Sequence, residues 1–187
     1  MSKQKEVTIS GVGGQGMILS GTLLAKAAAI HDHKKATLSS EYGVETRGTF
    51  AKSDVIVSDE EIYFPDVTEP DLVVCLHQIA YARYSGKVGE KGVLIYDSSE
   101  VTPDLAQAGK EIGVDITAEA KKAGHPATAN IIVMGMISGY LDLVEPEGAE
   151  EQIREFFGAK GEKTVQMNLV AYDNGYAIGK NLGQNRE

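Results

Sequence analysis

A glycine-rich loop between an apolar segment and a helical pattern constrains the fold of this chain more than any other feature. Residues 7–10 read as a short buried strand, and the loop Gly11–Gly16 (Gly-Val-Gly-Gly-Gln-Gly) follows it. Residues 17–30 then carry apolar side chains at helical spacing. Strand, glycine loop and helix in this order open a doubly wound fold. We therefore expect an α/β protein with a single doubly wound, mostly parallel sheet and helices on both faces, in a Rossmann-like arrangement.

The rest of the chain continues the alternation of strands and helices. We expect strands at 35–39, 49–58, 72–76 and 92–97, a weaker strand at 115–117, a short helix from there through Lys122, helices at 79–84, 128–143, 150–157 and 165–182, and an ordered loop at 39–48. Small residues in the helix at 128–143 suggest close packing against the sheet or another helix. Without a repeat or a low-complexity linker, residues 1–187 are predicted to form one domain.

Composition and charge narrow the classes of function. The net charge of −9 and the scattered basic residues disfavour nucleic-acid binding, because phosphates demand clustered Lys and Arg. The single cysteine, Cys75, cannot form an intramolecular disulfide or supply the four ligands of an ordinary iron–sulfur cluster. The polar start of the sequence and the lack of a run of roughly 20 apolar residues lead us to expect a cytoplasmic protein.

The spacing of Gly11, Gly13 and Gly16 matches the pattern G-x-G-x-x-G. Glycines allow positive φ and close approach of a phosphate, and the following helix offers unpaired N–H groups. The motif alone leaves open a nicotinamide or flavin dinucleotide, a tight crossover without ligand, or another anionic ligand or partner chain. A dinucleotide site needs an acidic residue about 20 residues further on. Glu41 stands near that distance, but within an irregular Ser-Ser-Glu-Tyr-Gly segment.

The expected loop at 39–48 carries a second group of polar residues, among them Glu41, Glu45 and Arg47. The guanidinium of Arg47 could hold a carboxylate or phosphate as a bidentate fork. It could equally form a surface ion pair with Glu45 or Glu41, or contact another subunit. The charge pattern does not decide between these alternatives.

The histidines and the single cysteine indicate no catalytic or metal centre. His77 follows the apolar strand at its carboxyl end, where ligands of open α/β sheets bind, yet a lone histidine there is more often a hydrogen-bonded structural residue. His125 precedes a proline and is expected in a loop. The four histidines show no metal-ligand spacing with carboxylates or Cys75, and no nucleophile or phosphate-loop motif occurs. We predict no catalytic residue and no metal ligand in this chain.

Two motifs taken together resemble a known family. The loop Gly11–Gly16, followed by Ser40-Glu41-Tyr42-Gly43-Val44-Glu45-Thr46-Arg47-Gly48, is similar to the paired signature of the gamma subunit of 2-oxoacid:ferredoxin oxidoreductases. The stretches 53–58, 70–71, 130–135 and 166–169 resemble it too. The family's second loop often reads Tyr-Gly-Pro-Glu-Ala-Arg-Gly-Gly. Val44, Thr46 and Thr49 depart from that pattern here, whereas Glu45, Arg47 and Gly48 agree with it.

The resemblance implies a non-autonomous subunit of a complex that converts a 2-oxoacid, coenzyme A and oxidised ferredoxin into an acyl-CoA, CO2 and reduced ferredoxin, most similar to the 2-oxoglutarate type. Thiamine diphosphate, Mg and 4Fe-4S clusters would belong to the partner alpha, beta and delta subunits. The resemblance implies that coenzyme A or the catalytic subunits face Gly11, Gly13, Gly14, Gln15, Gly16, Glu45, Arg47 and Gly48. A stand-alone NAD(P)-binding oxidoreductase and a purely structural assembly subunit remain the alternatives.

Overall fold

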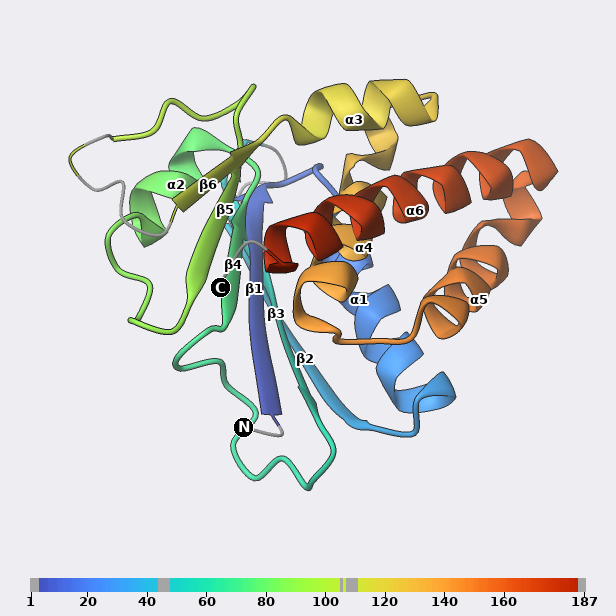
Figure 1. Cartoon of the computed structure of the whole chain (residues 1–187), viewed down its shortest axis with the longest axis horizontal. Coiled ribbons are helices and arrows are strands. Elements are labelled where there is room, and N and C mark those ends of the chain that lie inside the picture. The colour runs from blue at the N-terminus through green and yellow to red at the C-terminus, as the bar shows by residue number, and fades with distance from the viewer. Residues whose placement is uncertain (1–3, 44–47, 105, 107–110, 185–187) are drawn as a thin grey trace.

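The computed structural model describes residues 4–43, 48–104, 106 and 111–184. In chain order the elements are β1 (Gln4–Val12), α1 (Met17–Lys26), the π-helical turn η1 (Ala27–His31), β2 (Lys35–Tyr42), β3 (Phe50–Ser58), β4 (Leu72–Cys75), α2 (Gln78–Tyr84), β5 (Val93–Asp97), β6 (Glu111–Val114), α3 (Ile116–Ala123), the 3-10 turn η3 (Pro126–Thr128), α4 (Ala129–Leu141), α5 (Pro146–Phe157), the 3-10 turn η4 (Gly158–Lys160) and α6 (Glu162–Gln184). Figure 1 shows their arrangement. Within these residues no helix is long and apolar enough to cross a membrane.

One six-stranded sheet in the order β2-β3-β1-β4-β5-β6 forms the centre of the molecule (Figure 1). β1, β4, β5 and β6 run parallel to one another, whereas β3 pairs antiparallel with both β1 and β2. The chain passes from β1 through α1 to the edge strand β2 and returns as a hairpin, which places β3 between β1 and β2. The predicted α/β fold with a single, mostly parallel sheet is confirmed, with this hairpin as its antiparallel part.

The two faces of the sheet are covered unequally. Alternate residues of β1 point to opposite faces. Val7 and Ile9 join the larger core, to which α1, α3, α4, α5 and α6 also contribute. On the other face a smaller core gathers under α2, where Tyr81 packs with Cys75 and Phe50. Helices therefore lie on both faces, as predicted, but α2 is the only helix of the described residues that packs on the second one.

Helices α4 and α6 pack with their backbones in contact. A Cβ atom added at Gly135 would lie 2.1 Å from the carbonyl oxygen of Tyr172, and one added at Gly175 would lie 2.1 Å from that of Ile132. Gly139 and Gly179 meet the facing helix in the same way one turn further on. The small residues in α4 thus allow close packing against another helix, which was one of the two predicted possibilities. Helix α4 is buried on all sides.

Several predicted boundaries are wrong. Gly11 and Val12, expected in the glycine loop, are the last two residues of β1, because they pair with Ala51 and Phe50 of β3. The segment 39–42, expected in a loop, continues β2, because each of its residues pairs with β3 from Ser39 with Asp54 to Tyr42 with Ala51. The last parallel strand is residues 111–114 and not 115–117. Asp115 instead caps the amino terminus of α3, since its side chain accepts a hydrogen bond of 2.9 Å from the N–H of Ala118.

Candidate functional site

A cavity of about 610 Å³ opens at the carboxyl edge of the parallel strands. The glycine loop, the segments after β4 and at the end of β5, and the first turns of α1, α3, α4 and α6 build its wall. Its lining residues are Gly14, Gln15, Gly16, Leu19, Leu76, Asp97, Glu100, Thr117, Pro126, Ala127, Thr128, Ala129, Asn130, Phe157, Lys160, Thr164, Met167 and Asn168. Open α/β sheets bind ligands at this edge, where the strand order switches direction. This cavity is therefore the candidate site.

The glycine loop is closed from within by the side chain of Gln15. Its Oε1 accepts a 2.8 Å hydrogen bond from the N–H of Val12, and its Nε2 donates one of 2.9 Å to the carbonyl oxygen of Leu76. A Cβ atom at Gly11 would lie 2.3 Å from Gln15 Oε1. Gly11 thus makes room for this side chain, and the amide of Gln15 joins the end of β1 to the end of β4.

Gly16 and Asn130 bring the first turns of α1 and α4 together. Gly16 has φ of +79°, and a Cβ atom there would lie 2.8 Å from Asn130 Nδ2. Ser20 Oγ donates a 2.7 Å hydrogen bond to the carbonyl oxygen of Asn130. Asn130 is 6% exposed and lines the cavity, and its side-chain amide makes no hydrogen bond to the residues that the structure describes. A buried amide of this kind is suited to pair with a ligand.

Gly13, Gly14 and Gly48 differ in what surrounds them. The N–H of Gly13 donates a 3.0 Å hydrogen bond to the carbonyl oxygen of Thr49, which holds the end of the second motif against the glycine loop. Gly14 and Gly48 have φ of +102° and +77°, and no atom lies within 4 Å of a Cβ built at either. The fold therefore brings the two motifs side by side at the carboxyl end of β1. Of the residues predicted for the site, Glu45 and Arg47 lie outside the described residues.

Part of the cavity wall carries polar side chains that already have hydrogen-bond partners within the protein. Asp97 is buried at the end of β5, where its Oδ2 accepts a 2.7 Å hydrogen bond from Thr117 and its Oδ1 accepts from the N–H and Oγ of Ser99. Lys160 is the basic residue in the lining, and its ammonium group lies 5.3 Å from the centre of the Phe157 ring. Four helices also present their amino-terminal turns here, which favours an anionic group in the cavity.

Sequence reasoning missed Asn130, Asp97 and Thr117 as parts of this site. Asp97 had a signal, because it ends an apolar strand at the edge where ligands bind. Asn130 stands in the first turn of a long helix, but its contact with Gly16 comes from tertiary packing and leaves no local pattern. No local pattern reveals the hydrogen bond of Thr117 to Asp97 either.

The histidines near this edge have structural roles, as expected for His77. His77 Nδ1 accepts a 3.2 Å hydrogen bond from the N–H of Ile79 and caps α2, and His125 Nδ1 accepts one of 3.0 Å from Ala127 ahead of α4. Burial raises the pKa of Cys75 to about 12, so its thiol is neutral at ordinary pH. No three His, Cys, Asp or Glu side chains of the described residues are grouped to hold a metal ion.

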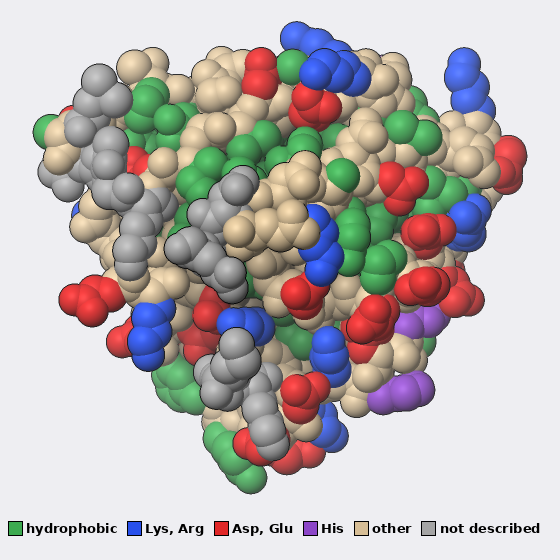
Figure 2. All heavy atoms as spheres, in the orientation of Figure 1, with side chains coloured by type: hydrophobic (Ala, Val, Ile, Leu, Met, Phe, Trp, Pro, Cys, Tyr) green, Lys and Arg blue, Asp and Glu red, His purple; other side chains and the backbone are tan. Residues whose placement is uncertain are grey.

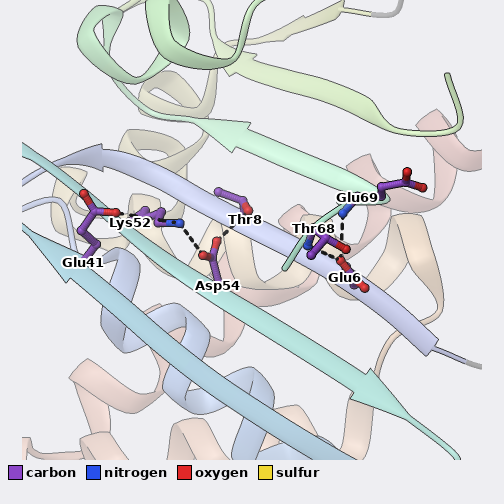
Figure 3. A network of polar contacts seen from close by, with 7 residues as sticks. All are labelled: Glu6, Thr8, Glu41, Lys52, Asp54, Thr68 and Glu69. Carbon is purple, nitrogen blue, oxygen red and sulfur yellow. Dashed lines mark hydrogen bonds and ion pairs between the residues drawn. The ribbon is translucent and has the colours of Figure 1, made fainter. Parts of the chain in front are cut away.

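The strand order argues against a dinucleotide site of the usual kind. Such a site takes its ribose-binding acid from the end of the strand beside β1. Here β3 occupies that place and runs the opposite way, while Glu41 lies on the edge strand β2. The carboxylate of Glu41 is 3.9 Å from the ammonium of Lys52, which contacts Asp54 at 2.6 Å (Figure 3). Glu41 therefore belongs to a polar network on the second face of the sheet.

Comparison of the sequence with known proteins gives matches over nearly the full chain. Residues 6–178 match the family model described as pyruvate ferredoxin/flavodoxin oxidoreductase. The 2-oxoglutarate synthase subunit KorC of Methanocaldococcus jannaschii is 38% identical, and the match covers 96% of both chains. KorC of Archaeoglobus fulgidus is 33% identical over 97% of this chain and 91% of the relative.

Solved structures agree with the sequence matches. The gamma subunit of a keto/oxoacid ferredoxin oxidoreductase from Geobacter sulfurreducens superposes with a TM-score of 0.79 at 34% identity, covering 94% of this chain and 96% of that one. The 2-oxoglutarate:ferredoxin oxidoreductase of Magnetococcus marinus, solved with 2-oxoglutarate, coenzyme A and succinyl-CoA, matches with a TM-score of 0.86 at 25% identity. That match covers 97% of this chain but 32% of the longer one. The family model and the end-to-end relatives together show that the chain belongs to the pyruvate ferredoxin/flavodoxin oxidoreductase family.

Proposed function

We propose that this chain is the gamma subunit of a 2-oxoglutarate:ferredoxin oxidoreductase, a complex that converts 2-oxoglutarate, coenzyme A and oxidised ferredoxin into succinyl-CoA, CO2 and reduced ferredoxin. The observation that carries the proposal is the end-to-end match to a KorC subunit at 38% identity. The Magnetococcus marinus match adds that the same fold forms about a third of a longer oxidoreductase chain. A domain of that kind works beside other parts of the enzyme.

The proposal assigns the reaction's cofactors to partner subunits. Thiamine diphosphate, Mg and the 4Fe-4S clusters would sit on alpha, beta and delta chains, with ferredoxin as the acceptor of the whole complex. The composition of this chain supports that division, because its one cysteine is too few for four thiolate ligands and is buried in the smaller core. The lack of a cysteine pair also fits the cytoplasmic location that we propose.

We further propose that coenzyme A reaches the cavity at the glycine loop. The amides of the loop and of the first turn of α1 would receive a phosphate group, since a helix amino terminus favours negative charge. Gly14 leaves open space for close approach, and the amide of Asn130 is available to pair with a polar group of the ligand. Gly11, Gly13, Gln15, Gly16 and Gly48 shape this surface in the proposal. The proposal includes Glu45 and Arg47 of the second motif, which lie outside the described residues.

Substitutions at Asn130 and Arg47 test the coenzyme A site in the assembled complex. Asn130→Asp places a negative charge in the cavity and Arg47→Ala removes a cation, so each should raise the KM for coenzyme A by roughly tenfold. The kcat at saturating coenzyme A should change little. Asn174→Asp on α6, outside the residues lining the cavity, is the control for an added charge. Unchanged kinetics in both variants would favour a purely structural assembly subunit.

A further inference from the structure

The loop between β3 and β4, residues 59–71, exposes two neighbouring aromatic side chains. Tyr63 is 93% exposed and Phe64 is 60% exposed, the former more than any other large apolar side chain among the described residues. Exposed aromatic residues that stand together are typical of sites where another protein binds, because such side chains gain most from being covered. The next residue, Pro65, is exposed as well.

The same loop is strongly acidic. It contains six carboxylates and neither lysine nor arginine: Asp59, Glu60, Glu61, Asp66, Glu69 and Asp71. Figure 2 shows acidic side chains beside a hydrophobic group at the lower end of the molecule, where Figure 1 places this loop. An aromatic pair inside an acidic rim matches a partner surface with an apolar pocket and basic surroundings.

Hydrogen bonds to β1 hold the loop in place before any partner binds. One oxygen of the Glu6 side chain accepts from the N–H groups of Thr68 and Glu69, at 2.9 and 3.2 Å (Figure 3). The N–H of Glu6 donates to Asp71 at 2.9 Å. At the other end of the loop, Glu61 pairs with Lys35 of β2 at 2.8 Å. Because the loop is ordered beforehand, docking would cost little conformational entropy.

A hollow lies next to the loop at the amino ends of the parallel strands. Carboxylates of Glu6, Glu69, Asp71 and Glu90 line it, together with one basic residue, Lys91. The excess of negative charge suits a lysine or arginine of a partner that covers the loop. This end of the sheet is opposite the carboxyl edge with the candidate site, so a partner docked here would leave the coenzyme A cavity open.

We propose that residues 59–71 dock onto a basic-rimmed apolar surface of a partner subunit of the complex, with Tyr63 and Phe64 as the buried anchors. The inference rests on the proposed function, since it takes its partner from the same complex. A second copy of this chain is a poor occupant, because two acidic loops would repel each other. The proposal requires a partner surface with an apolar pocket surrounded by lysine and arginine side chains.

The test measures assembly of this chain with its co-expressed partner subunits, one of which carries the affinity tag. Tyr63→Ser combined with Phe64→Ser should raise the dissociation constant for the partner subunits by roughly tenfold or more. Val170→Ser on α6 removes another exposed apolar side chain and should leave the dissociation constant unchanged. Melting curves of the isolated variants should match that of the wild type, because Tyr63, Phe64 and Val170 are all exposed. Added salt should raise the dissociation constant of the wild-type chain for the partner subunits more than that of the Asp66→Asn variant.

The outcomes separate this inference from the proposed function. If the wild-type chain does not bind the partner subunits at all, both fail. If the wild type binds and the Tyr63/Phe64 variant binds equally well, the docking surface is wrong while the subunit assignment stands. Equal losses for that variant and Val170→Ser would also overturn the inference. So would a dimer of the isolated chain that the Tyr63/Phe64 variant abolishes.

Discussion

Gly16 combines a left-handed backbone with a crowded position. Its φ is +79°, and a methyl group there would press against Asn130, whereas Gly14 has φ of +102° and open space around it. A residue with a side chain in this region costs about 1–2 kcal/mol, and crowding adds about 1–3 kcal/mol. We expect Gly16→Ala to lower the free energy of unfolding by about 2–5 kcal/mol and Gly14→Ala by about 1–2 kcal/mol, as urea denaturation would measure. Equal losses would mean that the contact with Asn130 contributes nothing.

Cys75 gives a prediction about reactivity. Burial removes water from its thiol and raises its pKa to about 12, despite a contact with Ser10 Oγ at 3.6 Å. The thiolate is the reactive form, so at pH 8 a thiol reagent should label the native chain roughly a thousandfold more slowly than the unfolded chain. Labelling of native protein at the rate of a free thiol would contradict the buried position.

The raised pKa of the Cys75 thiol also makes the stability of the fold depend on pH. The folded thiol has a pKa above the unfolded value, so ionisation stabilises the unfolded chain. The contribution of Cys75 is therefore complete below about pH 8.5 and is lost as the pH rises towards 12. Cys75→Ala should remove this part of the pH dependence in denaturation measurements between pH 8 and 10.

At the scale of residues, the sequence predicted the positions of the two motifs better than their roles. Glycine spacing locates the loop, because strand, glycine and helix patterns are local. It does not reveal that Gly11 makes room for Gln15 or that Gly16 makes room for Asn130. Those contacts depend on helices and strands far apart in the chain, and no local pattern encodes them.

The contact between α4 and α6 is the clearest test at the scale of elements. A methyl group at Gly175 would lie 2.1 Å from the carbonyl oxygen of Ile132, whereas one at Gly183 has its nearest neighbour at 3.4 Å. Gly175→Ala should therefore lower the free energy of unfolding by about 1–3 kcal/mol through overpacking. Gly183→Ala should leave it unchanged or raise it by up to about 1 kcal/mol, because alanine favours helix. The reverse order in thermal or urea denaturation would contradict the packing.

Most helices and strands were predicted from strong hydrophobic periodicity. The predictions that were wrong concern segments with weak patterns, for physical reasons. The strand β4 and the long helices α4 and α6 were predicted correctly, because their buried apolar residues form a pattern that is visible in the sequence itself. The polar end of β2 has no such pattern, because Ser39 to Tyr42 are extended only through their pairing with β3. The antiparallel place of β3 beside β1 was also beyond prediction, because strand order comes from tertiary packing and not from the alternation of residues.

The whole molecule presents two different surfaces at the two ends of its sheet. The cavity with the glycine loop lies at the carboxyl edge of the parallel strands, and the acidic aromatic loop lies at their amino edge. In the two proposals above, coenzyme A would reach the first of these surfaces and a partner subunit would cover the second. The chain has one cysteine, which is buried, and its described residues contain no group of side chains that could hold a metal ion.

Reconstitution tests this account most directly. The complex is assembled from its subunits with and without this chain, and reduction of ferredoxin is measured with 2-oxoglutarate and coenzyme A. We predict that omission of the chain abolishes the coenzyme A-dependent reaction, that its addition restores it, and that the isolated chain is inactive. Full turnover by the complex without this chain, or oxidation of 2-oxoglutarate by the chain alone, would contradict the assignment.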